Sequence, residues 1–297
     1  MLKIDFHSHS TFSDGTLEPY QLVAAASSAG LAGLALTDHD TTEGTGLFLE
    51  AAGRRKGFTG IAGTELSLDF KNTTHLLGLN VSPGGSKPLD LSFLQRFREE
   101  RNEGIFNALE ALGKPVSRER VAALSGSGQT GKPHFAKAML ERGWVAARQE
   151  AFDLYLGLGK PAYVKKRRLT PPEAVKLLLK AGWCPVLAHP ISMGVPEGDL
   201  AKVLGQWKAW GLVGLEVWHP SHSPEASAFF GRLARDAGLV ATCGSDYHGA
   251  NKDVPINWTL SRSPLSAAVL DRLREGLAAA LAKGAGGGAG ESVREAG

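Results

Sequence analysis

Histidine and acidic side chains recur in this sequence at the ends of short apolar runs. The first run leads into His7-Ser8-His9, and Asp14 follows a few residues later. Imidazole nitrogens and carboxylate oxygens are ligands that divalent and transition metals prefer in proteins. Taken singly, such a residue is more often core, turn or helix cap. Recurrence at five separate strand ends exceeds what packing explains and predicts more than one metal ion. The candidate ligands are His7, His9, Asp14, His39, Glu65, His75, His189, Asp246 and His248.

The elements that would position these ligands alternate between short apolar strands and amphipathic helices. Strands covered on both faces are nearly continuous apolar runs. Repeated strand–helix units predict a parallel sheet, and seven strands are enough to close into a barrel. The predicted strands are Leu2–Phe6, Gly33–Leu36, Gly60–Ala62, His75–Val81, Val186–Ala188, Gly214–Val217 and Val240–Cys243, and the helices between them are Pro19–Ala29, Thr45–Lys56, Pro172–Ala181, Leu200–Trp210 and Pro224–Ala237.

An α/β barrel carries its site at the carboxyl ends of its strands, where loops bring distant residues together. His7 and His9 follow the first strand, and residues i and i+2 of an extended chain face the same side. Nearly all the other candidates also follow strands. His75 is the exception, because it begins its run rather than ending it.

The segment 83–170 interrupts this alternation with helices and no good strand. Its expected helices are Leu91–Leu112, Ser117–Leu124, Lys132–Glu141 and Ala147–Leu156. It contains 16 basic and 9 acidic residues, whereas the whole chain has a net charge of only +3. This balance indicates either an anionic substrate or partner, or simply a solvated helical surface. We expect a helical insertion at 83–170 between two barrel parts, 1–82 and 171–283, followed by a flexible glycine-rich tail at 284–297.

Composition limits the class of protein further. The chain has 297 residues, 43% of them hydrophobic, which is enough for one large domain with an insertion. No run approaches the ~20 apolar residues that span a bilayer. The two cysteines, Cys184 and Cys243, lie in apolar runs and cannot form a disulfide framework. We therefore expect two buried core cysteines and a cytoplasmic protein without an obligate protein partner.

The ordered motifs resemble those of the PHP (polymerase and histidinol phosphatase) domain family. The resemblance covers 1–81 and resumes from about 170 to the last motif. It implies a distorted (β/α)7 TIM-like barrel that holds three divalent metal ions, commonly Mn, Fe or Zn. The motifs that carry it are His7-Ser8-His9, Ser13-Asp14-Gly15, Thr37-Asp38-His39-Asp40, Gly63-Thr64-Glu65, Ala188-His189-Pro190 and Gly244-Ser245-Asp246-Tyr247-His248.

The same resemblance distributes the ligands among three sites. The first ion would be held by His7, His9, Glu65 and Asp246. Glu65 would bridge to a second ion, held also by His75 and His189. The third ion would be held by Asp14, His39 and His248. Several relatives have a histidine where this chain has Asp14. The set of ligand atoms at the third site should therefore be harder in the sense of ligand softness, because an oxygen replaces a nitrogen.

Two elements of the insertion look like those of small bacterial PHP phosphoesterases, which include nucleoside 3′,5′-bisphosphate phosphatases and a 5′→3′ exoribonuclease acting on short RNA. They are Arg98-Glu99-Glu100-Arg101-Asn102 and Gly131-Lys132-Pro133-His134. The implied phosphate-binding residues are Arg98, Arg101, Asn102, Lys132 and His134. Lys132 stands where arginine is usual, which keeps the charge but loses the bidentate fork.

Together these features predict a trinuclear metal-dependent phosphoesterase whose substrate is a small phosphorylated nucleotide or a short oligonucleotide. A hydroxide between the first two ions would attack phosphorus, because metal coordination brings the pKa of water to ~7. The leaving oxygen would be stabilised by a metal ion, or protonated by His134 or by Asp246. The alternatives are a histidinol-phosphate phosphatase, an amidohydrolase, which would need a bridging lysine that we do not find, and a non-catalytic metal-bound PHP scaffold or nucleic-acid-binding module.

The run Lys165-Lys166-Arg167-Arg168 fits a charged surface or a phosphate site, and His219 and His222 could line the pocket without being ligands.

Overall fold

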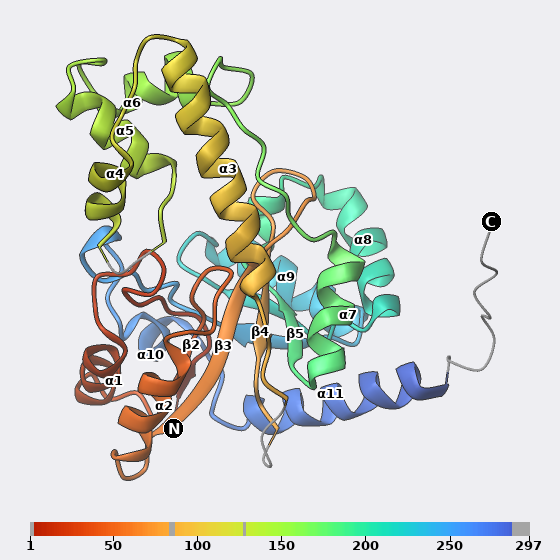
Figure 1. The fold of residues 1–297 in the computed structure, drawn as a ribbon. Coiled ribbons are helices and arrows are strands. Elements are labelled where there is room, and N and C mark those ends of the chain that lie inside the picture. Colours follow the sequence, from red (N-terminus) through yellow and green to blue (C-terminus); the bar gives the residue numbers. More distant parts are fainter. Residues whose placement is uncertain (1–2, 83–86, 127–128, 287–297) are drawn as a thin grey trace.

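Seven strands form one sheet whose spatial order follows the chain (Figure 1). The computed structural model describes residues 3–82, 87–126 and 129–286. Six of the seven strands were expected within two residues of their observed bounds, whereas β3 continues well beyond its predicted run. The strands are β1 (Ile4–Asp5), β2 (Gly33–Leu36), β3 (Thr59–Ser67), β4 (His75–Leu79), β5 (Cys184–Leu187), β6 (Gly214–Trp218) and β7 (Val240–Cys243).

The first and last strands meet and close the sheet into a barrel. The backbone N–H of Phe6 donates to the carbonyl of Cys243 at 3.1 Å. Beyond the strand ends, the N–H of Asp246 donates to the carbonyl of His7 at 3.0 Å. Closure therefore joins the two segments that carry the first and the last predicted metal ligands, and the expected distorted seven-stranded α/β barrel is confirmed.

The expectation of an all-parallel sheet is wrong at one strand. β4 pairs antiparallel with both β3 and β5, whereas the other neighbours pair parallel. The connection from Ser67 to His75 is too short for a crossover helix, so the chain turns back directly. The reversal places the amino end of β4, and with it His75, at the edge where the parallel strands have their carboxyl ends. The awkward position of His75 in the sequence is thereby explained.

Helices cover the outside of the barrel and its amino-terminal end. Gly182 and Gly211 end α7 and α8 in the left-handed conformation that favours glycine. In Figure 1, α11 runs across the end of the barrel opposite the insertion, and its Leu273 and Leu277 belong to one buried cluster with Val213 and Val240. The helices are α1 (Pro19–Ser28), α2 (Thr45–Gly53), α7 (Pro171–Ala181), α8 (Glu197–Trp210), α9 (Pro224–Asp236), α10 (Trp258–Arg262) and α11 (Val269–Gly286).

The predicted insertion is helical and stands above the rim of the barrel (Figure 1). The insertion packs around a hydrophobic core of its own, separate from that of the barrel, and this core includes Ile105, Phe135 and Met139. The expected helix Ala147–Leu156 is α-helical only in its first half and continues as a π-helical turn. The elements are α3 (Ser92–Ala111), α4 (Arg118–Ser125), α5 (Lys132–Glu141), α6 (Arg148–Ala151) and the π-helical turn Phe152–Leu156.

The carboxyl-terminal helix continues past the predicted start of the tail. α11 runs to Gly286, whereas a flexible segment was expected from 284. The rest of the predicted tail, 287–297, lies outside the described residues, as do residues 83–86 at the start of the predicted insertion. No helix among the described residues is long and apolar enough to cross a membrane.

Candidate metal centre and phosphate-binding cavity

Glu65 lies at the centre of the histidine and carboxylate cluster. Its Oε1 atom lies 2.7 Å from Nδ1 of His75 and 2.9 Å from Nε2 of His189. Its Oε2 atom lies 3.2 Å from Nε2 of both His7 and His9 and 3.1 Å from Nδ1 of His39. The two oxygens of one buried carboxylate thus face different histidines, which is the arrangement expected of a bridging ligand.

Asp246 completes the group around the second oxygen of Glu65. Its Oδ1 atom lies 3.5 Å from Nε2 of His7 and 3.3 Å from Nε2 of His9. The donor atoms of His7, His9, Glu65 and Asp246 all lie close enough together to hold one ion. These four residues are the set that the PHP resemblance implied for the first ion.

Asp14 gathers a further group at the mouth of the cluster. Its carboxylate lies 3.1 Å from Nε2 of His248 and 3.8 Å from Nε2 of His39. His9 joins this group, with Nδ1 at 3.7 Å from the same carboxylate. The Asp14 side chain is 55% exposed, whereas that of Glu65 is 1% exposed. An ion held here would be open to solvent and to an incoming substrate.

Three imidazole nitrogens in the cluster are buried and lack a hydrogen-bond partner among the described residues: Nε2 of His7, Nε2 of His9 and Nδ1 of His39. Each faces Glu65 Oε2 at 3.1–3.2 Å without hydrogen-bond geometry. A buried polar atom without a partner is costly, and a cation between nitrogen and carboxylate removes that cost. The donor set therefore fits divalent metal ions.

Burial and charge shift the pKa values of the cluster in opposite directions. Burial lowers the pKa of His39 to about 3. Burial also lowers the pKa of His9, but the carboxylates of Asp246 and Glu65 outweigh it and raise that pKa to about 9. Burial raises the pKa of Glu65, yet the surrounding imidazoles hold it well below its usual range. The carboxylates are therefore ionised and attract either protons or metal cations.

Glu216 and His219 belong to this network but were not predicted as members. Glu216 Oε1 lies 3.1 Å from Nδ1 of His7, and Oε2 accepts from the backbone N–H of His189 at 2.7 Å. Nδ1 of His219 accepts from the N–H of Ser221, which leaves Nε2 to face Asp246 Oδ2 at 3.3 Å. An acid inside the apolar strand Gly214–Trp218 was the sequence signal for Glu216. Its role here is to orient ligands, because its oxygens already accept hydrogen bonds.

The backbone at the rim is held in an uncommon conformation. Asp40, His189 and Asp246 have φ angles of 54°, 22° and 51°, a region that residues other than glycine rarely adopt. Such strain persists where the surrounding structure enforces it, and it concentrates at functional sites. Two of the three residues are predicted metal ligands.

A cavity of about 1000 Å³ opens above the cluster and separates the barrel rim from the insertion. Its floor includes Asp14, His39, His75 and His248, and its far wall is basic. Barrel ligands and insertion cations thus face one space, which suits an anionic substrate. The basic residues that line it are Arg98, Arg101, His134, Lys137, Arg148, Lys166, Arg168 and Lys252.

Three of the five residues expected to bind phosphate line this cavity: Arg98, Arg101 and His134. The Nε atoms of both arginines are buried without a hydrogen-bond partner among the described residues. The other two residues do not line it. Lys132 lies over the ring of Tyr163, with Nζ 4.1 Å from the ring centroid, and Asn102 donates to the carbonyl of Thr130 at 3.3 Å. We therefore leave them out of the phosphate site.

The basic run before α7 divides between the cavity and the surface. Lys166 and Arg168 line the cavity, whereas Lys165 pairs with Asp69 and Arg167 lies over the ring of Phe97. Alternate residues of an extended chain face opposite sides, which accounts for the division. Asp40 pairs with both Lys166 and Arg98, so it anchors two of the cations that line the cavity.

A closed barrel whose rim gathers imidazoles and carboxylates beneath a basic cavity defines a metal-dependent phosphoesterase. Among solved structures with this fold is a metal-dependent phosphoesterase from Bifidobacterium adolescentis, with a TM-score of 0.71 and 27% identity over 93% of this chain and 96% of that one. Another, described as an amidohydrolase from Chromobacterium violaceum with bound sulfate and no metal, has a TM-score of 0.73 and 30% identity over 94% and 96% of the two chains.

The PHP domain family model matches residues 5–155, which is 151 of the 297 residues, and the chain belongs to this family. A 5′-3′ exoribonuclease from Haemophilus influenzae is 34% identical over 248 residues, 83% of this chain and 90% of the relative. A 3′,5′-nucleoside bisphosphate phosphatase from Chromobacterium violaceum is 33% identical over 253 residues, 84% and 88% of the two chains. The predicted family and the phosphoric-ester hydrolase class are confirmed.

Proposed function

We propose that this chain hydrolyses a phosphate ester of a nucleotide, such as a nucleoside 3′,5′-bisphosphate, or of 5′-phosphorylated short RNA. The observation that carries the proposal is the cavity that joins the candidate ligand cluster to Arg98 and Arg101, whose Nε atoms are buried without a hydrogen-bond partner among the described residues. A substrate with one phosphate at the cluster and a second anionic group at the arginines would match both walls. The names of the two curated relatives agree with such substrates.

We further propose three divalent ions per chain. His7, His9, Glu65 and Asp246 would hold the first, and the other oxygen of Glu65 would share the second with His75 and His189. The third would be held by Asp14, His39 and His248. The distances around Glu65 and Asp14 support this division. When bound, such ions lower the pKa of water to ~7 and offset the negative charge that grows on the phosphate oxygens.

His134 is the better candidate for protonating the leaving oxygen. Its Nδ1 accepts from the N–H of Gly131 at 2.9 Å, so the ring's other nitrogen, Nε2, carries the proton. Burial, together with Lys137 and Arg98, lowers the His134 pKa, and an arriving phosphate would raise it again. Asp246 is a poor proton donor, because its imidazole neighbours outweigh burial and hold its pKa well below the usual range.

The test is a hydrolysis screen of metal-loaded protein with added Mn²⁺, Zn²⁺ or Fe²⁺. The substrates are nucleoside 3′,5′-bisphosphates, mononucleotides, 5′-phosphorylated short RNA and histidinol phosphate. We expect the highest kcat/KM on a bisphosphate or on the RNA. A clear preference for histidinol phosphate would replace the nucleotide proposal.

The bridging role is tested by Glu65→Gln, with Glu275→Gln on the exposed face of α11 as the matched control. Elemental analysis of the native protein should give more than one transition-metal ion per chain. Glu65→Gln should lower turnover by orders of magnitude and reduce the metal content, because one amide oxygen cannot replace two anionic ones. Normal turnover in folded, metal-loaded Glu65→Gln protein would remove Glu65 from the site.

A further inference from the structure

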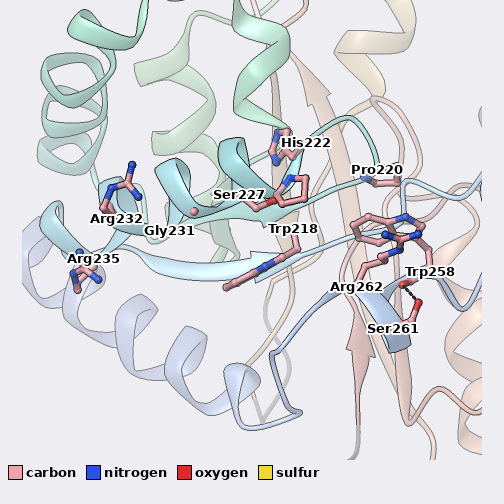
Figure 2. Close-up of a pocket in the computed structure, with 12 residues that line it drawn as sticks. Trp218, Pro220, His222, Ser227, Gly231, Arg232, Arg235, Trp258, Ser261 and Arg262 are labelled. Carbon is pink, nitrogen blue, oxygen red and sulfur yellow. Dashed lines mark hydrogen bonds between the residues drawn. The ribbon is translucent and has the colours of Figure 1, made fainter.

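A second hollow lies on the outer wall of the barrel, between α9 and α10, with a volume of about 810 Å³. Figure 2 shows Arg232 and Arg235 on one side, Trp258 and Arg262 on the other, and Trp218 between them. We call this hollow the α9–α10 groove. None of the predicted metal ligands lines it, so it is separate from the catalytic cavity.

The groove carries three guanidiniums and no carboxylate along its lining. Within the described part of the chain, Arg232 and Arg262 form no ion pair, and Arg235 pairs only with its neighbour Asp236, at 3.5 Å. All three arginine side chains are exposed. Cations that are not neutralised by the protein favour an anionic occupant.

Two tryptophans, Trp218 and Trp258, give the same groove flat apolar surface. Both are half-buried, so part of each indole stays accessible. Aromatic rings interleaved with cations are the combination that binds single-stranded nucleic acid, because bases stack on the rings while phosphates meet the cations. A purely anionic ligand would have no use for the two indoles.

His222 supplies an independent sign that a ligand binds here. It lines the groove and is only 8% exposed. Its Nδ1 donates to the carbonyl of Val217 at 2.9 Å, which leaves Nε2 as an acceptor, and Nε2 has no hydrogen-bond partner among the described residues. Buried polar atoms are normally paired. A ribose hydroxyl or a base amino group is a donor of the kind that this nitrogen lacks.

The groove adjoins the catalytic site through two segments of chain. Trp218, Pro220 and His222 line the groove, whereas His219 between them faces Asp246 in the metal cluster. Likewise His248 lines the catalytic cavity, and Trp258 of the groove follows it by ten residues. One extended polymer could therefore reach both places.

We propose that the α9–α10 groove is an exosite for single-stranded RNA, which holds a part of the strand away from the reacting phosphate. The exosite proposal relies on the proposed function only for the statement that the rest of the strand leads to the reacting phosphate. The ligand itself is indicated by the arginines, tryptophans and His222 of the groove. Trp218 and Trp258 stack bases, and Arg232, Arg235 and Arg262 contact phosphates. A nucleoside bisphosphate is too short to gain from the groove.

The main experiment measures binding of a 3′-fluorescein octaribonucleotide with a 5′-hydroxyl end to metal-loaded protein by anisotropy. This RNA lacks the terminal phosphate that the catalytic cavity is proposed to bind, so the assay stands even if the proposed function fails. The variant is Trp258→Ala with Arg262→Ala, and the control is Arg55→Ala, an exposed arginine near α2. We expect the double variant to weaken RNA binding about tenfold or more, since each stacked base contributes ~1–3 kcal/mol. KM for the bisphosphate should not change.

A second variant guards against misfolding, because Arg232→Ala with Arg262→Ala alters only exposed side chains. It should lower the slope of log affinity against log salt by about 1.4, because each arginine that neutralises one phosphate of a single strand accounts for ~0.7 of that slope. Unchanged RNA affinity in both double variants would overturn the exosite. Displacement of the RNA by polyphosphate as effectively as by unlabelled RNA would also overturn it, because the groove would then bind anions in general.

Discussion

The Nδ1 atom of His7 lies 3.1 Å from Oε1 of Glu216, and both side chains are fully buried. The other oxygen of Glu216 accepts from the backbone N–H of His189. One carboxylate from β6 thus orients a histidine after β1 and a histidine after β5. Donation from Nδ1 also leaves the Nε2 lone pair of His7 free to point at a metal.

Replacing Glu216 by Gln should lower metal affinity by about 10–100-fold, as is typical when a group that orients a ligand is changed. The amide can present its NH₂ group to His7 and favour the wrong tautomer. The measurement is competition of the folded protein with a metal-sensitive dye. Glu197→Gln, on the exposed first turn of α8, is the control. If the Glu216→Gln variant binds metal with the affinity of the native protein, the carboxylate of Glu216 does not orient the metal ligands and contributes only to packing.

Arg101 should act on the substrate's second phosphate. Arg101→Ala is expected to reduce kcat/KM for a nucleoside bisphosphate mainly through KM, with a smaller effect on an aryl phosphate that lacks the second group. Burial, together with Arg98 and Arg168, lowers the pKa of Arg101 to about 10, so it stays charged at neutral pH. The control is Arg120→Ala, which breaks only an exposed pair with Glu141. Equal losses on both substrates would place Arg101 at the reacting phosphate or in the fold.

His134 should matter most where the leaving group is poor. His134→Gln is expected to slow kcat on a nucleotide by about 10²–10⁴-fold, the usual contribution of a general acid. The loss on an aryl phosphate should be much smaller, because a phenolate leaves without a proton. Comparing kcat for the two substrates in one variant provides an internal control. Losses of equal size would assign His134 to phosphate binding alone.

The combined contribution of His9 and His39 to the stability of the metal-free protein should be most favourable near pH 6.5. The folded pKa of His9 is raised from 6.5 to about 9, so the stability it contributes is fully present below 6.5 and is lost as the pH rises through 9. The folded pKa of His39 is lowered to about 3, so stability falls as the pH drops from 6.5 towards 3. The measurement is the Tm of chelated protein across this range.

Bound metal should flatten the alkaline part of this profile. Metal ligands are neutral imidazoles, so ion binding releases the proton that His9 carries below pH 9. Calorimetric titration of Mn²⁺ in two buffers of different ionisation enthalpy should show proton release at pH 7 and less at pH 9.5. Equal proton release at both pH values would contradict the raised pKa of His9.

The barrel, and the histidines and carboxylates that gather at its rim, could be predicted because these residues follow strand ends, and strand ends can be recognised locally. From the sequence alone, the position of His75 at the start of its strand could not be reconciled with a site at the carboxyl ends of the strands. The antiparallel pairing of β4, which explains this position, depends on the two neighbouring strands rather than on the residues of β4. Glu216 was missed although an acid within an apolar strand was visible. Lys132 and Asn102 show another limit: a motif match places a residue on a helix end but does not decide which way its side chain turns.

The salt bridges of Asp40 have a consequence for motion. One buried oxygen of this barrel residue pairs with Arg98 in the first helix of the insertion and with Lys166 where the chain leaves it. The beginning and the end of the helical insertion are therefore both bound to the barrel rim through the same carboxylate. Opening by a hinge at either end alone would leave the other cation fastened to the rim. Substrate should therefore enter and leave through a mouth of nearly constant width, and product release should not wait for a lid.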